Sequence, residues 1–181
     1  MNFIEKQDNL LTKKECMDAI EWSCKNKGFI PDHNKERYTG YDYCDLMLDG
    51  ENFEQCFSAV SLRPIYRAIN TLTDSYIKRV PEVNRLSLWG MQAIRLKRWT
   101  RNNHYSDWHS EHMPQWSGRV LSFLIYLSDN NAHTEFRRYR NVRTKAGRGI
   151  MFPAYFTHEH RGSICKNGLD RYIVSGYCGF K

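Results

Sequence analysis

The feature that most constrains the fold is a series of short β-rich segments in the second half of the chain. From Leu86 onward, stretches rich in Ile, Val, Tyr, Phe and Trp alternate with turn residues. Such spacing is typical of an all-β sandwich or barrel. The segments are SLWGMQAIRLKRW, RVLSFLIYLSD, TEFRRYRNVRT, RGIMFPAYF and RYIVSGYCGF. We therefore predict a jelly roll, or double-stranded β-helix, over about residues 86–181.

Two helical patterns precede these segments. Thr12 followed by Glu15 has the form of a capping box and opens the first helix. The second pattern covers residues 53–80, with Pro64 near a helix start. Residues 31–52 are rich in Asp, Asn, Gly and Tyr and are predicted to form a loop. The expected fold class is α+β, mainly β, with N-terminal helices that support the jelly roll.

Length and composition favour one domain. No linker-like stretch or repeat divides the 181 residues, so we expect one domain with helical support over about 1–85 and a jelly-roll core over about 86–181. The N-terminal sequence lacks the apolar core of a signal peptide, and the longest apolar run, VLSFLIYL, is far too short to span a bilayer. The cysteines form no CxxC pair. We expect a cytoplasmic protein with reduced thiols and no membrane partner.

The charge of the chain is concentrated in one segment. The formal net charge is +7, and residues 136–148, FRRYRNVRTKAGR, contain many basic residues and no acidic one. A solvated hairpin is the simpler interpretation of this segment. If the segment is functional, it would attract the phosphates of nucleic acid or an acidic protein partner.

A histidine-rich segment, HYSDWHSEH at 104–112, suggests a metal site. In an extended segment residues i and i+2 project to the same side, so His109 and Glu111 can face one ion. A third ligand must come from elsewhere, and the other dense histidine segment is FTHEHRG at 156–162. Two imidazoles and one carboxylate leave open positions on a non-haem Fe(II). A His-x-Glu motif alone is weak evidence, and the missing HExxH excludes a zincin site.

Six motifs in order resemble the Fe(II)/2-oxoglutarate-dependent dioxygenases, in particular the prolyl 4-hydroxylase-like branch. They are YSDWHSE, RVLSFLIYLSD, HTEF, GRGIMFP, HEHRG and RYIVSGY, between about residues 89 and 180. The resemblance implies Fe(II), 2-oxoglutarate as co-substrate and O₂, with hydroxylation of a C–H bond in proline or in a prolyl residue of a polypeptide. Two alternatives stay open: the same chemistry on nucleic acid or another small molecule, and a non-catalytic binding module.

The resemblance also assigns the iron ligands. His109 and Glu111 fall on the first two ligand positions, where Glu replaces the commoner Asp. The distal ligand is His160 or His158. His160 lies eleven residues before Arg171, close to the usual spacing, and is therefore the favoured assignment. Arg171 falls on the basic residue that binds the distal carboxylate of 2-oxoglutarate, a role that suits a guanidinium.

Other site residues follow from the same resemblance. Ser175 and Tyr126 are the expected hydroxyl partners of that carboxylate. Trp99 stands where many relatives have a second tyrosine, so this contact is expected to be lost or replaced. The tyrosine-rich segment 36–45 is a candidate lid. Residues near the motifs that could face the substrate, each equally compatible with ordinary packing, are Arg119, Trp108, Trp116 and Tyr155.

Overall fold

The computed structural model describes residues 2–32, 40–85, 89–100, 103–104, 107–166 and 168–180. In chain order its helices and strands are β1 (Glu5–Gln7), α1 (Lys13–Asn26), β2 (Ile30–Pro31), β3 (Asp42–Met47), α2 (Phe53–Cys56), α3 (Arg63–Arg79), β4 (Trp89–Trp99), β5 (Arg119–Tyr126), β6 (His133–Phe136), β7 (Val142–Arg143), β8 (Gly149–Pro153), β9 (His160–Gly162) and β10 (Arg171–Phe180). Short 3₁₀ helices cover Pro81–Arg85, Pro114–Trp116 and Phe156–His158.

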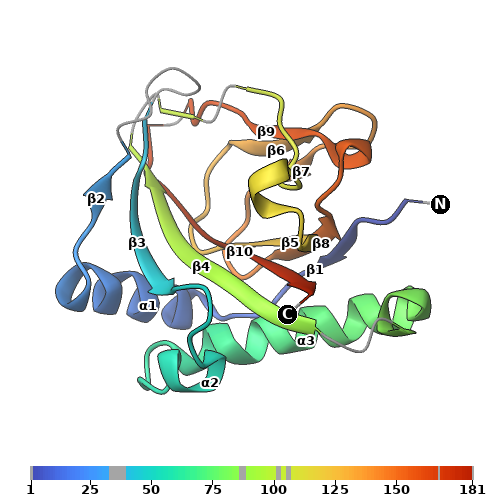
Figure 1. The fold of residues 1–181 in the computed structure, drawn as a ribbon. Coiled ribbons are helices and arrows are strands. Elements are labelled where there is room, and N and C mark those ends of the chain that lie inside the picture. Colours follow the sequence, from blue (N-terminus) through green and yellow to red (C-terminus); the bar gives the residue numbers. More distant parts are fainter. Residues whose placement is uncertain are drawn as a thin grey trace.

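The strands form two antiparallel sheets. The larger has seven strands in the order β1-β8-β5-β10-β4-β3-β2, and the smaller has three in the order β7-β6-β9. The helices lie along one side of the larger sheet, and the smaller sheet lies on its other side (Figure 1). This arrangement confirms the predicted fold class, a mainly β jelly roll with supporting helices.

Both predicted helical regions are confirmed. The N-cap of α1 is Thr12, whose Oγ1 accepts a hydrogen bond from the backbone N–H of Glu15 at 3.2 Å. The Glu15 carboxylate in turn accepts from the backbone N–H of Thr12 at 2.8 Å, which completes the capping box. The second region divides into α2 and α3, and Pro64 lies in the first turn of α3, where its missing N–H is not needed.

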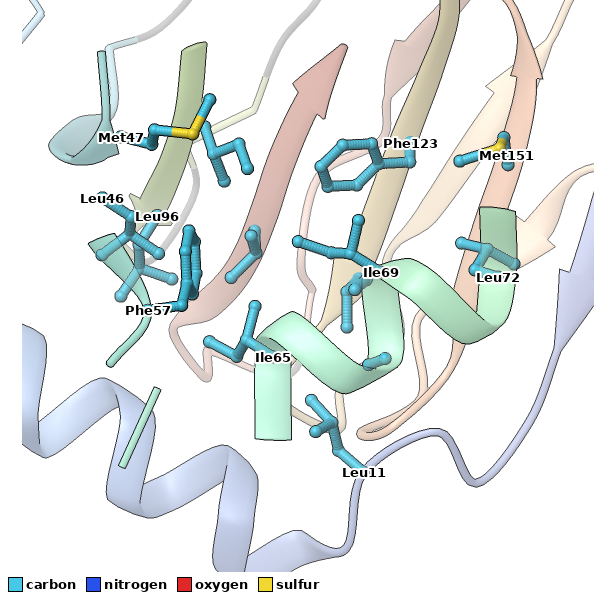
Figure 2. Packing of buried hydrophobic residues seen from close by; sticks show 14 of the residues in the cluster. Leu11, Leu46, Met47, Phe57, Ile65, Ile69, Leu72, Leu96, Phe123 and Met151 are labelled. Carbon is cyan, nitrogen blue, oxygen red and sulfur yellow. The ribbon is translucent and has the colours of Figure 1, made fainter. Parts of the chain in front are cut away.

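The main hydrophobic core lies between α3 and the larger sheet (Figure 2). Helix α3 places Ile65, Ile69 and Leu72 on one face at helical spacing, packed with Phe123 of β5 and Met151 of β8 in one buried cluster. Each of these side chains is fully buried, and burial of one such side chain contributes about 1.5–3 kcal/mol. The helix therefore covers one face of the sheet and leaves the opposite face for the site.

A second buried cluster fills the space between the two sheets. Strand β5 contributes to both clusters because its side chains alternate: Phe123 and Ile125 belong to the cluster under α3, whereas Leu124 and Tyr126 belong to the other. The remaining members of this second cluster include Trp99, Phe136, Val142, Ile150 and Phe152. The two sheets are thus held face to face at a fixed separation.

The prediction of a loop over 31–52 is wrong for residues 42–47, which form β3 and pair with β4. Cys44 and Leu46 alternate into the core, and Asp45 on the other face forms a 2.6 Å ion pair with Arg95 of β4. Acidic residues disfavour strands in isolation. Here the arginine on the neighbouring strand neutralises the carboxylate, and the segment alone does not contain that information.

The prediction of a lid over residues 36–45 is also wrong for residues 41–45. Tyr41 is buried and packs against Trp99 at a ring-centroid distance of 5.2 Å, and residues 42–45 belong to β3. Residues 36–39 lie outside the described part of the chain. Strands β1, β2 and β3 extend the larger sheet, so residues that were expected to be helical support also build the sheet.

None of the helices in the described part of the chain combines the length and the apolar character that crossing a membrane requires.

Candidate active site

A cavity of about 410 Å³ is lined by residues of both sheets. Alternate side chains of β4, at positions 95, 97 and 99, and of β10, at positions 171, 173, 175 and 177, form its floor. Because alternate residues of a strand project to the same face, the pairing of these two strands sets the layout of the site. The opposite wall comes from Thr134 of β6, from β9 and from the segment around His109.

A backbone bridge brings the two histidine-rich segments together. The N–H of His109 donates to the carbonyl oxygen of His160 at 3.1 Å, and the N–H of His160 donates to the carbonyl oxygen of His109 at 3.0 Å. The centroids of the two imidazole rings are 4.4 Å apart. This isolated β-bridge joins residues that are far apart in the sequence and places both rings in the cavity.

Both imidazoles direct Nε2 toward Glu111. Nδ1 of His109 lies 3.0 Å from the carbonyl oxygen of Asp107, and Nδ1 of His160 lies 3.2 Å from that of His158. Because a carbonyl oxygen only accepts, Nδ1 keeps its proton in each ring, and Nε2 is the nitrogen left for a metal ion. The two Nε2 atoms lie 3.6 and 3.8 Å from Oε1 of Glu111.

These three side chains form the one group of potential metal ligands found among the described residues. One ligand atom from each of His109, Glu111 and His160 lies within 4.8 Å of the others. Two imidazoles and one carboxylate are the donor set of a non-haem Fe(II) centre with open coordination positions. The donor chemistry therefore fits the metal that the sequence motifs suggest.

The second oxygen of Glu111 is held by the protein. Oε2 accepts a hydrogen bond from the hydroxyl of Tyr177 at 3.0 Å and lies 3.6 Å from Nη1 of Arg119. The Arg119 guanidinium lies over the rings of Tyr177, at 3.6 Å, and Trp116, at 4.3 Å. These contacts leave Oε1 directed at the imidazoles, which is how the longer glutamate is oriented toward the ligand group.

The local electrostatics keep the carboxylate charged. Burial by itself raises the pKa of Glu111, but the hydrogen bond and charge of His109, with a contribution from Lys97, hold that pKa well below its ordinary value. Burial lowers the pKa of His160 to about 3, so this ring is neutral. Burial also raises the pKa of Tyr177, which therefore remains a hydrogen-bond donor. An ionised carboxylate beside a neutral imidazole is ready to bind a cation.

His158, the alternative distal residue, has a separate environment. It is buried, its Nδ1 lies 2.9 Å from the hydroxyl of Thr157, and its ring stacks on Tyr139 with a centroid distance of 4.7 Å. It does not belong to the group formed with Glu111. The geometry therefore favours His160, and the assignment of the distal ligand remains a prediction.

Arg171 is a buried cation in the same cavity. Its side chain donates weakly to the hydroxyl of Thr134 at 3.3 Å and to the carbonyl of Ser163 at 3.5 Å, and the guanidinium lies 5.4 Å from the Trp99 ring. Within the described part of the chain it forms no ion pair, and its Nε has no partner. Burial lowers the pKa of Arg171. Because an unpaired buried charge is costly, this position is suited to an anionic ligand.

The remaining predicted partners of that ligand have different environments. Ser175 is buried and lines the cavity. Tyr126 is buried in the second cluster, and its hydroxyl bonds to that of Thr134 at 2.7 Å. Thr134 thus links Tyr126 to Arg171. The sequence analysis did not single out Thr134, and its alternating position in the HTEF strand was the one signal that could have indicated it. Trp99 lines the cavity, and its buried Nε1 has no partner among the described residues, so an indole N–H is available there.

The candidate substrate-facing residues divide into two groups. Arg119 and Trp116 line the cavity, and Trp116 is exposed. Trp108 lies between the guanidinium groups of Arg137 and Arg161, at 4.8 and 4.6 Å. Neither Trp108 nor Tyr155 lines the cavity, and the Tyr155 ring instead packs at a tilt against that of His112, with a centroid distance of 4.6 Å. A role in substrate binding remains a prediction for all of them.

The basic segment 136–148 contains paired and unpaired charges. Arg137 pairs with Glu159 at 2.8 Å, and Arg148 forms two hydrogen bonds to Asp8. Its exposed arginines without an ion pair in the described region are Arg138, Arg140 and Arg143. Contact of this segment with nucleic acid or with an acidic partner remains a prediction.

Comparison with known proteins adds independent information. Residues 91–179 match the model of the 2OG-Fe(II) oxygenase superfamily. No curated protein matches the sequence. Similar solved structures include a viral collagen prolyl hydroxylase from Paramecium Bursaria Chlorella virus-1 in its 2OG complex, with a TM-score of 0.70, 16% identity and coverage of 99% of this chain and 97% of that chain.

Two further similar structures are also those of prolyl hydroxylases. A Pseudomonas putida prolyl-4-hydroxylase has a TM-score of 0.66 and 13% identity, with 100% of this chain and 94% of that chain covered. A Trichoplax adhaerens prolyl hydroxylase in complex with a hypoxia inducible factor peptide fragment has a TM-score of 0.71 and 13% identity, with 99% and 84% covered. At these identities the structures show a shared fold.

The matched segment contains all three side chains of the ligand group and the buried Arg171. The superfamily match and the donor chemistry of the cavity therefore agree. The protein is an oxygenase of the 2OG-Fe(II) superfamily with the fold of the prolyl hydroxylases, and it uses Fe(II), 2-oxoglutarate and O₂.

Proposed function

We propose that this oxygenase hydroxylates proline, either as a prolyl residue of a polypeptide or as the free amino acid. Three solved structures with the same fold are titled prolyl hydroxylases, and one of them binds a peptide fragment. The motif order of the sequence supports the same branch. The substrate class is inferred from this shared fold, and the reaction type follows from the site.

The reaction consumes 2-oxoglutarate, O₂ and a substrate C–H bond, and gives succinate, CO₂ and a C–OH group. Fe(II) held by His109, Glu111 and His160 would supply the activation of O₂. Arg171 would bind the distal carboxylate of 2-oxoglutarate with its planar guanidinium. The walls of the cavity orient the co-substrate and exclude water.

One observation supports the reaction type: the ligand group and an unpaired buried guanidinium lie in a single cavity. A 2-oxo dicarboxylic acid has one end for a metal ion and another for a cation. The cavity offers both, because Glu111 and the imidazoles lie at one part of its wall and Arg171 at another. This combination supports 2-oxoglutarate over a monocarboxylic co-substrate.

The test is oxidation of a proline-containing polypeptide. Purified protein with Fe(II), 2-oxoglutarate and O₂ is incubated with a proline-rich peptide and with the same peptide carrying alanine at each proline. We expect succinate formation and the gain of one oxygen atom on proline, measured by mass spectrometry. Succinate formation that neither a proline-containing peptide nor free proline stimulates, without oxygenated proline, would contradict the substrate assignment and leave the oxygenase chemistry intact.

Two alanine variants test the distal ligand in the same assay. His160→Ala should abolish Fe(II) binding and succinate formation, because it removes one of three ligands. His158→Ala should keep Fe(II) binding, since that ring contacts Tyr139 and Thr157 instead. Loss of iron in the His158 variant alone would show that the distal assignment is wrong.

Nucleic acid is a second candidate substrate, supported by the exposed arginines of segment 136–148. Binding to a single-stranded oligonucleotide that weakens steeply with salt, together with oxygenation of the oligonucleotide, would favour this class.

A further inference from the structure

The wall formed by β3 and β4 carries cations that are paired with carboxylates, with one exception. Arg95 forms an ion pair with Asp45 at 2.6 Å, and Arg98, on the other face of β4, pairs with Asp42 at 2.5 Å. Lys97 lies between them and is opposite Tyr43 of β3 in the strand register. Among the described residues no carboxylate forms an ion pair with Lys97.

The Lys97 ammonium group lies in the cavity and under aromatic cover. Lys97 is one of the lining residues, and its Nζ is 5.3 Å from the centroid of the Tyr41 ring. Tyr41 in turn packs on Trp99, so two aromatic rings lie beside this part of the wall. A cation over an aromatic face gains about 0.5–2 kcal/mol, which only partly offsets the loss of hydration.

The charges around Lys97 do not neutralise it. Burial lowers its pKa, the negative charges of Glu111 and Asp32 act in the opposite direction, and the positive charges of Arg95 and Arg119 add to the lowering. The carboxylate of Glu111 is already shared by the imidazoles, Tyr177 and Arg119. A cation in such surroundings is stabilised most by an anion that enters the cavity.

The position of Lys97 separates it from Arg171. On the paired strands Arg171 is opposite Trp99, whereas Lys97 is opposite Ile173. Along β4, Lys97 is therefore two residues from the position opposite Arg171, a distance of about 7 Å. Farther along β10 in the same direction is Tyr177, whose hydroxyl donates to Glu111. Lys97 is therefore displaced from the Arg171 site toward the metal ligands, so one small carboxylate does not satisfy both cations.

We propose that Lys97 forms a second carboxylate-binding site in this cavity. The carboxylate comes from the 2-oxo-acid end of the co-substrate or from the substrate, and an ammonium point charge suits either source. The inference rests on the proposed use of this cavity for Fe(II) and 2-oxoglutarate, and the case in which the substrate supplies the carboxylate rests also on the proposed use of proline. Removal of the Lys97 ammonium group should lower the affinity for this carboxylate about 10–100-fold, as expected for the loss of a hydrogen bond to a charged group.

The first experiment tests the co-substrate as the source. Wild type, Lys97→Met and Lys97→Arg are loaded with Fe(II) without O₂ and titrated with 2-oxoglutarate and with pyruvate, which keeps the 2-oxo-acid end but has no distal carboxylate. The visible absorption of the Fe(II)–2-oxo-acid complex reports binding. If Lys97 binds this end, Lys97→Met weakens both acids by the same factor, and Lys97→Arg restores most of the affinity.

The second experiment tests the substrate as the source. If both titrations are unchanged in Lys97→Met, the Fe(II)–2-oxoglutarate complexes are titrated with L-proline and L-prolinamide, which differ in the carboxylate. Wild type should then prefer proline, and Lys97→Met should lose this preference. Equal affinities of wild type and Lys97→Met for all four probes overturn the proposal.

These outcomes are distinguishable from failure of the proposed function. Absence of the Fe(II)–2-oxoglutarate absorption in wild type would count against the site as a whole, whereas a normal absorption that is identical in Lys97→Met counts against Lys97 alone. All titrations are equilibrium measurements without turnover, so they do not depend on hydroxylation of proline. Far-UV circular dichroism of both variants checks that β4 and its sheet are retained.

Discussion

The side chain of Glu111 is one methylene longer than aspartate, and the structure engages both of its oxygens. Oε1 is directed at the two imidazoles, whereas Oε2 is held by Tyr177 and Arg119. Residues that hold a ligand in this way determine its orientation and its affinity for the metal. Glutamate at this position is therefore matched to its neighbours and is not an isolated replacement.

Removal of the Tyr177 hydroxyl should weaken metal binding. In Tyr177→Phe the Oε2 atom loses its 3.0 Å hydrogen bond, and we expect the affinity for Fe(II) or Mn(II) to fall about 10–100-fold. Calorimetry under anaerobic conditions measures this affinity. Tyr172→Phe is the matched control, because Tyr172 lies on the same strand but packs with the cluster under α3. Equal metal affinity in both variants would contradict the positioning role.

At the site, sequence reasoning was strongest where spacing along one strand decides geometry. His109 and Glu111 could be expected to face one side because they are at positions i and i+2, whereas Arg171 and Ser175 were assigned from the family resemblance and only their shared face follows from their spacing on one strand. Thr134 could not be predicted, since its contacts with Tyr126 and Arg171 join three strands of two sheets. The Tyr177 contact to Glu111 was missed for the same reason.

At the scale of elements, an ion pair joins the end of the N-terminal strand β1 to the start of its neighbour β8 in the larger sheet. Asp8 follows β1, Arg148 precedes β8, and the two side chains form hydrogen bonds of 2.5 and 3.0 Å. The hydrogen bond from Arg148 lowers the pKa of Asp8 to about 2, from an ordinary value of 3.8. The folded state therefore favours the ionised carboxylate.

This pair should make the contribution of Asp8 depend on pH. A lowered pKa stabilises the folded state above pH 3.8, and the stabilisation is lost as the pH falls through about 2. Asp8→Asn should therefore lower the free energy of unfolding by about 1 kcal/mol or less at neutral pH, because the pair is partly exposed. The difference from wild type should shrink between pH 4 and pH 2.

Urea unfolding across this pH range measures the effect. Asp18→Asn, which alters an exposed pair with Lys14 within α1, serves as the control for a surface carboxylate. A difference between Asp8→Asn and wild type that stays constant down to pH 2 would contradict the linkage.

The elements themselves were predictable where a segment carries its own pattern. Helix α1 has its capping box, α3 has apolar residues at helical spacing, and β5 and β10 have the β-branched and aromatic residues of strands. Strand β3 was not predictable from its own residues. Its acidic positions are tolerated because Arg95 and Arg98 lie across from them, and this pairing arises only when the sheet forms.

For the whole molecule, the unpaired Arg171 means that folding buries a charge whose partner is a ligand. Such a cation destabilises the ligand-free protein, and an anion that binds it should raise the stability of the fold. When the free concentration of the ligand is 100 times its dissociation constant, this gain in stability is about 2.7 kcal/mol. Stability and co-substrate binding are therefore coupled through one side chain.

The variant Arg171→Leu should separate the stability of the fold from the binding of the co-substrate. We expect this variant to be at least as stable as wild type without ligand, and to lose the stabilisation that Fe(II) and 2-oxoglutarate give to wild type. Thermal unfolding without O₂ measures both quantities. In the control Arg98→Leu, Asp42 loses its partner outside the cavity, so stability should fall while the response to 2-oxoglutarate is kept. A full response in Arg171→Leu would contradict the role of Arg171.

The two-way hydrogen bond between His109 and His160 has a consequence for how this chain can vary. The rings meet because the backbones of the two residues pair directly, whatever the path of the chain between them. Insertions and deletions in the turns between these positions are therefore compatible with the centre, provided that the bridge keeps its register. A shift of one residue at the bridge turns one imidazole to the opposite face. The centre thus tolerates change in length around it far better than a single slip in pairing.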